Sequence, residues 1–388
     1  MHLVWINQHA SMIGGAEHYI ANTARHLRNR GVHSTLLYDP NLPTSATMLD
    51  SFDHAFPLVD VLGQISESNA DLVFMHQTRE PSVAAGLARS PVPVVEFLHD
   101  HWLFCLRIQK YTTLTRQTCT RTANSLACYP CLGFVRRESS FPRFRLRTLS
   151  DLHAEHRIRK PFAGFVTGSQ YMAEQAIAHG FDAAKVHVTP LYADTPRKTN
   201  EEVLRQPYRL LYVGAILPYK GIDILVKALH HVHTPTHLDI VGEGSFADDI
   251  LRLVDRYRLH KRITFYGKLN RSQLDYHYRR ATCLVLPSRT PESFGIVGAE
   301  AMSYGLPAIV SDIGGALEWL EPGQTGLTFP INDAEALAKT IDRFMTNPKL
   351  AEDMGQAAHR RYQERFRPEH HVDRLLTVFT SILRQGVS

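Results

Sequence analysis

Two glutamates near the carboxyl-terminal third of the chain, Glu292 and Glu300, lie eight residues apart with a glycine-bearing turn between them. The apolar run 282–286 precedes them and predicts a buried strand, and Glu300 falls in a predicted short helix. The first backbone N–H groups of a helix have no partners within the helix and can bind a phosphate. Two acids that accept hydrogen bonds from hydroxyl groups, beside such a helix, suit a sugar nucleotide better than a bare anion.

A lysine follows another strand end in the second half of the chain. The apolar run 209–213 predicts a strand, Gly214 ends it, and Lys220 lies in the turn that leads into the next predicted helix. An ammonium group at such a turn can act as a point charge against a diphosphate. A surface lysine in an ordinary strand-to-helix turn fits the same pattern. The phosphate-type turn between Glu292 and Glu300 makes contact of Lys220 with a diphosphate the favoured interpretation.

The first half of the chain has two weaker signals of the same kind. Gly14 and Gly15 follow the first predicted strand, where glycine lets the backbone approach a ligand at a helix N-terminus. His99 and Asp100 follow the apolar run 92–98, at the carboxyl end of a predicted strand, which is where ligands bind in open parallel sheets. A histidine at a strand end is more often a structural hydrogen-bonding residue. A functional role for His99 is therefore supported by its position alone.

The order of apolar runs and helical patterns predicts an α/β protein. Both halves of the 388-residue chain alternate short buried strands with amphipathic helices, which predicts two Rossmann-like, doubly wound domains that face each other across a cleft. The predicted parts are a first domain over 1–193 with a basic, cysteine-containing insertion over about 101–141, a linker over 194–207, a second domain over 208–365, and a C-terminal helix over 366–388 that packs back on the first domain.

The composition is that of a soluble globular protein, with 44% hydrophobic and 21% charged residues. No apolar run approaches the ~18–20 residues that span a bilayer, and the start of the chain lacks the basic region and cleavage site of a signal peptide. We therefore expect a cytoplasmic protein. The net charge of +5 is mild, and the excess of basic residues is confined to the segment 134–162. No recognised nucleic-acid-binding module is present, which argues against nucleic acid as a partner.

Together these motifs resemble those of the retaining glycosyltransferases of family 4, over nearly the whole chain. The resemblance is carried by Gly14-Gly15, His99-Asp100, Ser169, the turn from Gly214 to Lys220-Gly221, the Gly242 and Gly244 pair, and Glu292 with Glu300. It implies the two-domain GT-B architecture. It also implies an enzyme that moves a hexose from a UDP- or GDP-linked donor to a saccharide or lipid-linked saccharide acceptor, in cell-surface polysaccharide or glycolipid synthesis.

The same resemblance implies roles for individual residues. Glu300 would hold the nucleotide ribose, and Glu292 would hold the hydroxyl groups of the donor sugar. Lys220 would stabilise the leaving diphosphate and His99 would contact the transferred sugar, so that Glu292, His99 and Lys220 form the catalytic set. The implied donor-binding residues are Gly14, Gly15, Gly214, Lys220, Glu292, Ser293, Phe294, Gly295, Ile296 and Glu300.

The resemblance also implies a reaction without a metal ion, because cationic side chains and a helix dipole take its place in such enzymes. The family offers no nucleophile at the expected position under the sugar. The implied route is therefore a front-face displacement, in which the leaving phosphate helps to deprotonate the acceptor.

Two residues depart from the family pattern. The family usually has arginine where this chain has Ala215, which removes one of the two cations expected at the diphosphate, and Arg289 is a candidate to replace it. The family commonly has glycine at the position of Ser293. Two other functions stay open, namely a GT-B-type nucleotide-sugar epimerase and an inactive family member that acts as a binding protein. A phosphorylase would need a pyridoxal-binding lysine, and no such site is evident.

Four of the five cysteines, Cys105, Cys119, Cys128 and Cys131, lie in the insertion. Cys128 and Cys131 have the Cys-x-x-Cys spacing, so a structural zinc site with four thiolate ligands is one interpretation. Reduced thiols without a ligand, or one disulfide under oxidising conditions, are the others.

The segment 134–162 carries eight lysine or arginine residues against three acidic ones, interleaved with phenylalanine and leucine. A helix is expected over about 143–159, where this composition predicts a basic amphipathic surface. Such a surface could rest on anionic lipid headgroups at the inner face of the plasma membrane, where a lipid-linked acceptor would be reached. A solvated basic helix, or a surface that binds an acidic polysaccharide, fits the same composition.

Overall fold

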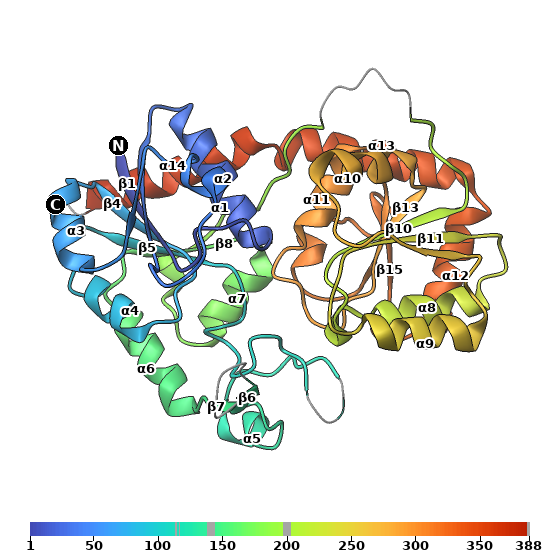
Figure 1. Ribbon diagram of the computed structural model, residues 1–388, viewed down its shortest axis with the longest axis horizontal. Helices are drawn as coiled ribbons and strands as arrows, with labels where there is room; N and C mark the ends of the chain where they lie inside the picture. The colour runs from blue at the N-terminus through green and yellow to red at the C-terminus, as the bar shows by residue number, and fades with distance from the viewer. Residues whose placement is uncertain (113–114, 116, 138–143, 197–202, 386–388) are drawn as a thin grey trace. The chain divides into compact units, whose positions relative to one another are not determined.

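The computed structural model describes residues 1–112, 115, 117–137, 144–196 and 203–385 (Figure 1). The chain forms two compact units, each built around its own parallel sheet. Unit 1 comprises Met1–Gln109, Thr120–Pro190 and Pro368–Ser388, and unit 2 comprises Lys110–Cys119 and Leu191–Arg367.

Unit 1 contains a seven-stranded parallel sheet with the strand order β3-β2-β1-β4-β5-β8-β9. Its strands are β1 His2–Asn7, β2 His33–Tyr38, β3 His54–Pro57, β4 Leu72–Met75, β5 Val94–Leu98, β8 Gly164–Thr167 and β9 Val186–Val188. Strands β4, β5 and β8 consist of buried residues only, as expected for parallel strands with helices on both faces. The strand order reverses between β1 and β4, so a ligand site is expected beyond the carboxyl ends of these two strands.

Helices cover both faces of this sheet (Figure 1). The helices of unit 1 are α1 Gly15–Arg28, α2 Ala46–Leu49, α3 Val61–Ser68, α4 Pro81–Leu87, α6 Leu149–Arg159, α7 Gln170–Ala178 and α14 Pro368–Gln385, with the 3-10 turn η1 Ala183–Lys185. The short helix α5 Ser125–Cys128 and the antiparallel hairpin of β6 Val135–Arg137 and β7 Phe144–Leu146 lie in the insertion, away from the sheet (Figure 1). The C-terminal helix α14 belongs to unit 1, where the Tyr19 hydroxyl lies 2.8 Å from His371 Nε2 and Phe379 packs edge-on against Phe74.

Unit 2 contains a six-stranded parallel sheet with the strand order β12-β11-β10-β13-β14-β15. Its strands are β10 Arg209–Val213, β11 His237–Val241, β12 Ile263–Phe265, β13 Cys283–Leu286, β14 Ala308–Ser311 and β15 Gly326–Phe329. The order reverses between β10 and β13, so the loops after these two neighbouring strands start side by side at the carboxyl edge of the sheet.

Two apolar clusters fill the two sides of the unit 2 sheet. One packs α8, α9 and α12 on the strands, and the other packs α10, α11 and α13. The bounds of these elements are α8 Ile222–His231, α9 Ala247–Tyr257, α10 Arg271–Arg280, α11 Ile296–Ser303, α12 Ala334–Met345 and α13 Pro348–Arg365, with the 3-10 turns η2 Pro218–Lys220 and η3 Gly315–Glu318.

The parallel sheets of seven and six strands confirm the prediction of two doubly wound α/β domains. The structure also differs from the sequence analysis in one assignment, because residues 110–119 group with unit 2 and not with the insertion of the first domain. In unit 2, the Thr118 hydroxyl donates to the main-chain oxygen of Arg289, and Tyr111 forms a β-bridge with Thr118. Residues 197–202 of the predicted linker lie outside the described residues.

The helix expected over about 143–159 begins later, at Leu149. Thr148 ends the extended segment that contains β7 and caps the helix, since its side chain accepts a hydrogen bond from the Asp151 N–H and the Asp151 carboxylate accepts one from the Thr148 N–H. The expected start of the helix at 143 lies outside the described residues.

Candidate active site

The loops after β10 and β13 touch backbone to backbone at Gly221. This glycine has φ 70°, in the left-handed region, and a Cβ atom at this position would lie 1.8 Å from the carbonyl oxygen of Pro287. Only glycine fits both conditions. The close approach places Lys220, at the end of η2, beside the segment that carries Glu292.

Lys220 and Glu292 form an ion pair at this position. The Lys220 Nζ lies 2.8 Å from Glu292 Oε1 and 2.9 Å from Oε2, and the Ser288 hydroxyl donates to Oε1 at 2.5 Å. The two charged side chains are 26% and 17% exposed, so a ligand can reach both. Burial lowers the pKa of Lys220 and the Glu292 carboxylate raises it by more, so the ammonium group is charged at neutral pH.

Gly295 and helix α11 provide the main-chain part of the site. Gly295 adopts φ 80° and ψ 64° and stands at the N-cap position of α11. The preceding Phe294 is fully buried, and its carbonyl oxygen accepts a hydrogen bond from Trp319 Nε1 at 2.8 Å. The Phe294 side chain is therefore part of the core, and only its main chain is available for the predicted contact with a donor. Ser293 and Phe294 connect Glu292 to Gly295, and the first turn of α11 begins at Ile296.

Glu300 lies one turn into α11, which begins at Ile296, and two residues of α10 hold its carboxylate. Arg271 Nη1 donates to Glu300 Oε1 at 2.5 Å, and the Tyr278 hydroxyl donates to Oε2 at 2.8 Å. Arg271 also forms an ion pair with Asp275, at 3.0 Å from Nε to Oδ1. Burial and the neighbouring Glu300 carboxylate raise the pKa of Tyr278 well above its usual value, so its hydroxyl stays a donor.

Sequence reasoning identified Glu300 but not the two residues that orient it. Asn270 and Gln273 form a capping box that starts α10, and this pattern could have located the N-terminus of the helix, and with it Arg271. No pattern in the sequence pairs Arg271 or Tyr278 with a glutamate more than twenty residues later.

In unit 1, His99 and His76 form a pair at the carboxyl ends of β5 and β4. His76 Nδ1 lies 2.8 Å from His99 Nε2, so one ring donates to the other. Burial lowers the pKa of His99 to about 3, and burial together with the neighbouring His99 lowers that of His76 well below its usual value. Both rings are therefore neutral at pH 7. His99 can accept or donate a hydrogen bond but does not carry a charge.

The residues around His99 build its loop and a small cavity. The Asp100 carboxylate accepts a hydrogen bond from the Trp102 N–H at 2.7 Å, and a cavity of about 30 Å³ is lined by His99, Asp100 and Trp102 among others. In the same unit, Gly14 is the N-cap of α1 and Gly15 its first residue. The structure thus brings His99 together with His76 in unit 1 and Lys220 together with Glu292 in unit 2, where Gly295 caps the helix that carries Glu300.

Two family models match adjoining parts of the chain. A model described as "Glycosyltransferase Family 4" matches residues 13–197, and one described as "Glycosyl transferases group 1" matches residues 195–361. The chain belongs to family 4 of the glycosyltransferases. This finding confirms the resemblance stated from the motifs.

Several curated relatives match this family 4 chain over part of its length. The glycogen synthase of Mycobacterium tuberculosis is 33% identical over 193 residues, which are 49% of this chain and 44% of that protein. The lipopolysaccharide core biosynthesis mannosyltransferase LpcC of Rhizobium leguminosarum bv. viciae is 30% identical over 215 residues, which are 53% of this chain and 59% of that protein. The chain spans about half the length of these relatives.

Solved structures match the family 4 chain over almost its full length. HepE of Anabaena in complex with UDP has a TM-score of 0.75 at 18% identity and is covered over 100% of its length by 98% of this chain. The sucrose-phosphate synthase of Thermosynechococcus elongatus has a TM-score of 0.74 at 21% identity, with 99% of each chain covered. At these identities the likeness shows the fold, which is that of the GT-B glycosyltransferases.

The position of Arg289 does not fit the role of a replacement cation for Ala215. Its guanidinium forms two parallel hydrogen bonds with Asp223, at 2.6 and 2.7 Å, and a third with the carbonyl oxygen of Pro218 at 2.8 Å. The side chain is 11% exposed. Arg289 thus ties the loop after β13 to α8, and Ala215 leaves Lys220 as the cation that this turn contributes to the site.

The four cysteines of the insertion are divided between the two units. Cys119 falls in unit 2, and Cys105, Cys128 and Cys131 fall in unit 1. All four are half-buried. Within the described ranges, no group of three or more histidine, cysteine, aspartate or glutamate side chains is arranged as a metal site.

The zinc site stays a prediction, and metal analysis tests it. Protein purified without chelator is expected to contain about one zinc ion per chain, since four thiolates fill a tetrahedral site. Replacement of Cys128 and Cys131 by serine should abolish that content, and the Cys283→Ser variant is the control because Cys283 is a buried residue of β13. A zinc content near zero in the unaltered protein would contradict the prediction.

The basic segment 134–162 is not a uniformly solvated surface. Arg147 and Arg159 are buried, and Arg159 lies between the carboxylates of Glu96 and Glu155. Residues 138–143 lie outside the described part of the chain. Two of the eight cations counted in the sequence are thus unavailable to an anionic surface. Among the helices that the structure describes, none is both long and apolar enough to span a bilayer.

Proposed function

We propose that this chain transfers a hexosyl group from a nucleotide sugar to a saccharide or lipid-linked saccharide, with retention of the anomeric configuration. The observation that carries the proposal is the Lys220–Glu292 pair beside the N-terminus of α11, with the Glu300 carboxylate on the same helix. A cation and unpaired helical N–H groups suit a diphosphate, and two carboxylates suit sugar hydroxyls.

Lys220 stabilises the leaving diphosphate in this proposal. Its ammonium group has three donors, and Glu292 accepts hydrogen bonds from it. When the donor binds, phosphate oxygens share the ammonium group and the sugar hydroxyls donate to Glu292. The positive end of the α11 dipole adds to the stabilisation of charge that develops on the leaving oxygen.

Glu300 holds the ribose of the nucleotide in this proposal. A carboxylate can accept hydrogen bonds from both ribose hydroxyls, provided that its plane is fixed. Arg271 and Tyr278 fix it from the side of α10. The ribose hydroxyls then compete with Arg271 for the oxygens of Glu300. Arg271 keeps its ion pair with Asp275.

The chemical step needs no nucleophile from the protein. The bond between the anomeric carbon and the phosphate oxygen breaks, and the acceptor oxygen forms its bond on the same face of the sugar. The acceptor's proton passes to the leaving phosphate. The neutral His99 contacts the transferred sugar, and Lys220 takes the place of a divalent ion, so we expect turnover in the presence of a chelator.

The donor is proposed to be a UDP- or GDP-linked hexose. Support comes from the similar structures of HepE in complex with UDP and with UDP-glucose, and from relatives that are mannosyltransferases of lipopolysaccharide core and O-antigen chains. The two mannosyltransferases also support a role in cell-surface polysaccharide or glycolipid synthesis. We propose a cytoplasmic location with peripheral association at the inner face of the plasma membrane through segment 134–162, where Val135 and Leu146 are exposed cross-strand partners.

Nucleotide release with and without acceptors tests this function. Thermal shifts with UDP- and GDP-sugars first identify the donor, since a ligand that binds the folded chain raises the melting point. Release that depends on a saccharide acceptor, with an anomeric product of unchanged configuration by NMR, supports the proposal. Release of nucleotide and free sugar without acceptor would indicate an epimerase, and binding without release would indicate an inactive binding protein.

A further inference from the structure

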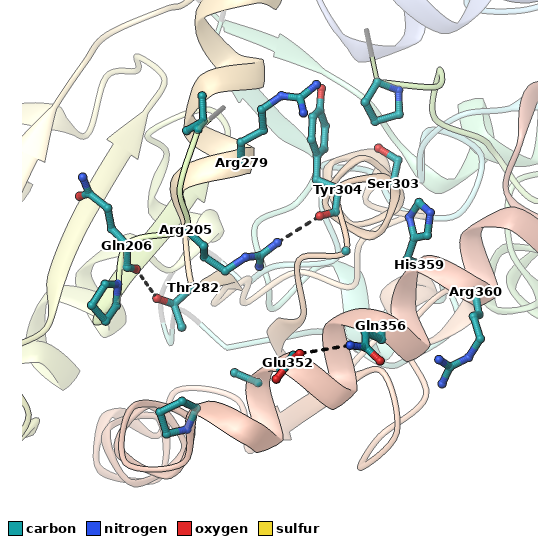
Figure 2. Close-up of a pocket in the computed structure, with 16 residues that line it drawn as sticks. Arg205, Gln206, Arg279, Thr282, Ser303, Tyr304, Glu352, Gln356, His359 and Arg360 are labelled. Carbon is teal, nitrogen blue, oxygen red and sulfur yellow. Dashed lines mark hydrogen bonds between the residues drawn. The ribbon is translucent and has the colours of Figure 1, made fainter. Parts of the chain in front are cut away.

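Unit 2 contains a cavity of about 880 Å³ (Figure 2). Gln206 and Pro207 line it and precede β10, and Thr282 lines it and precedes β13. The cavity therefore lies at the amino ends of these strands, whereas Lys220 and Glu292 follow their carboxyl ends. A five-residue strand is about 15 Å long, so the two sites are separate.

Cationic side chains from three elements line this cavity. Arg205 comes from the segment before β10, Arg279 from the end of α10, and Arg360 from α13 (Figure 2). Across the described ranges, no carboxylate lies within ion-pair distance of Arg205 or Arg360. Guanidinium groups that protein carboxylates do not neutralise favour an anion with several acceptor oxygens.

Among the residues that the structure describes, Glu352 contributes the one carboxylate in the lining of the cavity, and other groups already compensate it. Lys349 lies 3.6 Å from Glu352, and the Gln356 amide donates to Glu352 at 3.3 Å. The described part of the lining therefore has more cationic than anionic side chains. Its further polar groups include the hydroxyl-bearing Thr282 and the imidazole of His359, which can contact the non-ionic part of a ligand.

The cavity shares Tyr304 with the network that orients Glu300. Arg205 Nη2 donates to the carbonyl oxygen of Tyr304 at 3.1 Å, and the Arg279 guanidinium lies 5.4 Å from the centre of the Tyr304 ring. That ring stacks on Tyr278 with a centroid distance of 5.1 Å and an angle of 12°. Tyr278 donates to Glu300.

A second connection runs through the hydroxyl of Tyr304. This hydroxyl donates to Asp275, which forms the ion pair with Arg271, and Arg271 donates to Glu300. A ligand that draws Arg205 or Arg279 away from Tyr304 would change the packing of both residues that hold the Glu300 carboxylate. Tyr304 thus connects the cavity to both residues that hold the Glu300 carboxylate.

We propose that this cavity is an effector site for a small polyanion that carries two or more phosphate groups, and that its occupancy alters nucleotide binding at Glu300. Three arginines from separate elements can each hold a different phosphate oxygen, and the volume accommodates a bisphosphate or a phosphorylated sugar. The effect on the affinity for nucleotide rests on the proposed function, whereas the binding of the polyanion to the cavity does not. Coupling of this kind is reciprocal between the two ligands.

Inorganic pyrophosphate is the probe, and calorimetry with the full chain is the measurement. Pyrophosphate can also bind beside Lys220, so the Lys220→Ala variant isolates the cavity. In that background, Arg205→Gln with Arg279→Gln is expected to weaken binding at least about tenfold, since each lost charged hydrogen bond contributes about 1.5–3 kcal/mol. Arg252→Gln, which removes the same charge from the exposed surface of α9, should leave binding unchanged.

The second measurement is the affinity for UDP or GDP, with and without saturating pyrophosphate, in chains that retain Lys220. A change of about threefold or more that disappears in the Arg205→Gln, Arg279→Gln variant supports the effector role. Pyrophosphate binding that is insensitive to both arginines would overturn the site. Arginine-dependent binding without any change in nucleotide affinity would overturn the effector role. Melting curves confirm that the variants are folded, and the Arg205→Lys, Arg279→Lys variant should retain part of the binding because it keeps the charge.

Discussion

The Lys220→Ala variant is expected to lose about two to three orders of magnitude in kcat, because it removes the cation that we propose to stabilise the leaving diphosphate. Ala215 occupies the position of the family's other cation, and Arg289 is committed to Asp223, so the turn offers no substitute. The loss should fall mainly on kcat, since charge on the leaving oxygen develops in the transition state. Steady-state nucleotide release with the donor and acceptor found by screening is the measurement.

Glu292→Gln provides the companion test of the same pair. The amide keeps the shape of the side chain but removes the charge that accepts donor hydroxyls, so a loss of about tenfold to a hundredfold in kcat/KM is expected. Both side chains are partly exposed, so neither change should lower the melting point by much. Arg252→Ala is the matched surface control. Activity close to that of the unaltered chain in both variants would contradict the assignment of this pair.

The meeting of Lys220 and Glu292 could be predicted from the sequence because both follow strongly apolar strands. Parallel strands bring their carboxyl ends to one edge of a sheet, and β10 and β13 are neighbours. The glycine at 221 is consistent with a close approach of the two loops. The ion pair at 2.8 Å was not predicted, since strand order does not determine where two side chains point.

The environment of Glu300 could not be predicted in the same way. Its partners Arg271 and Tyr278 lie on α10, and the contact depends on how that helix packs on α11. Helix packing is set by the shapes of many side chains across the interface, which no local pattern encodes. The same limit applies to His76, which forms the pair with His99 only because β4 and β5 are adjacent.

Charge in the sequence is a poor guide to charge on the surface. Arg289 lies within three residues of Glu292 but binds Asp223, which lies 66 residues earlier. Arg147 and Arg159 add to the basic composition of segment 134–162 but are buried. A long cationic side chain can turn inward when a carboxylate pairs with it, as for Arg159, or when a carbonyl oxygen and an aromatic ring contact it, as for Arg147. The sequence does not show which groups these are.

Arg159→Ala is expected to destabilise unit 1 by about 3–5 kcal/mol, because it leaves two buried carboxylates without their counter-charge. Arg159 is 1% exposed, its Nε donates to Glu96 Oε2 at 2.7 Å, and its Nη1 donates to the Glu155 carboxylate. Hydrogen exchange of β5 and α6 in increasing urea measures the stability of this unit. Arg157→Ala is the matched control, since Arg157 is exposed on the same helix, and it should cost less than about 0.5 kcal/mol.

The pH dependence of the Arg159→Ala variant separates buried charge from lost packing. Burial raises the pKa of Glu96 even with Arg159 in place, and loss of the guanidinium should raise it further. A carboxyl group whose pKa is higher in the folded than in the unfolded chain favours folding at low pH, so the deficit should shrink between pH 7 and pH 5. A triple variant that combines Arg159→Met, Glu96→Leu and Glu155→Leu removes every charge of the trio and should restore most of the stability. A deficit that is independent of pH and persists in the triple variant would show that packing by the arginine stem, and not its charge, stabilises this part of the sheet.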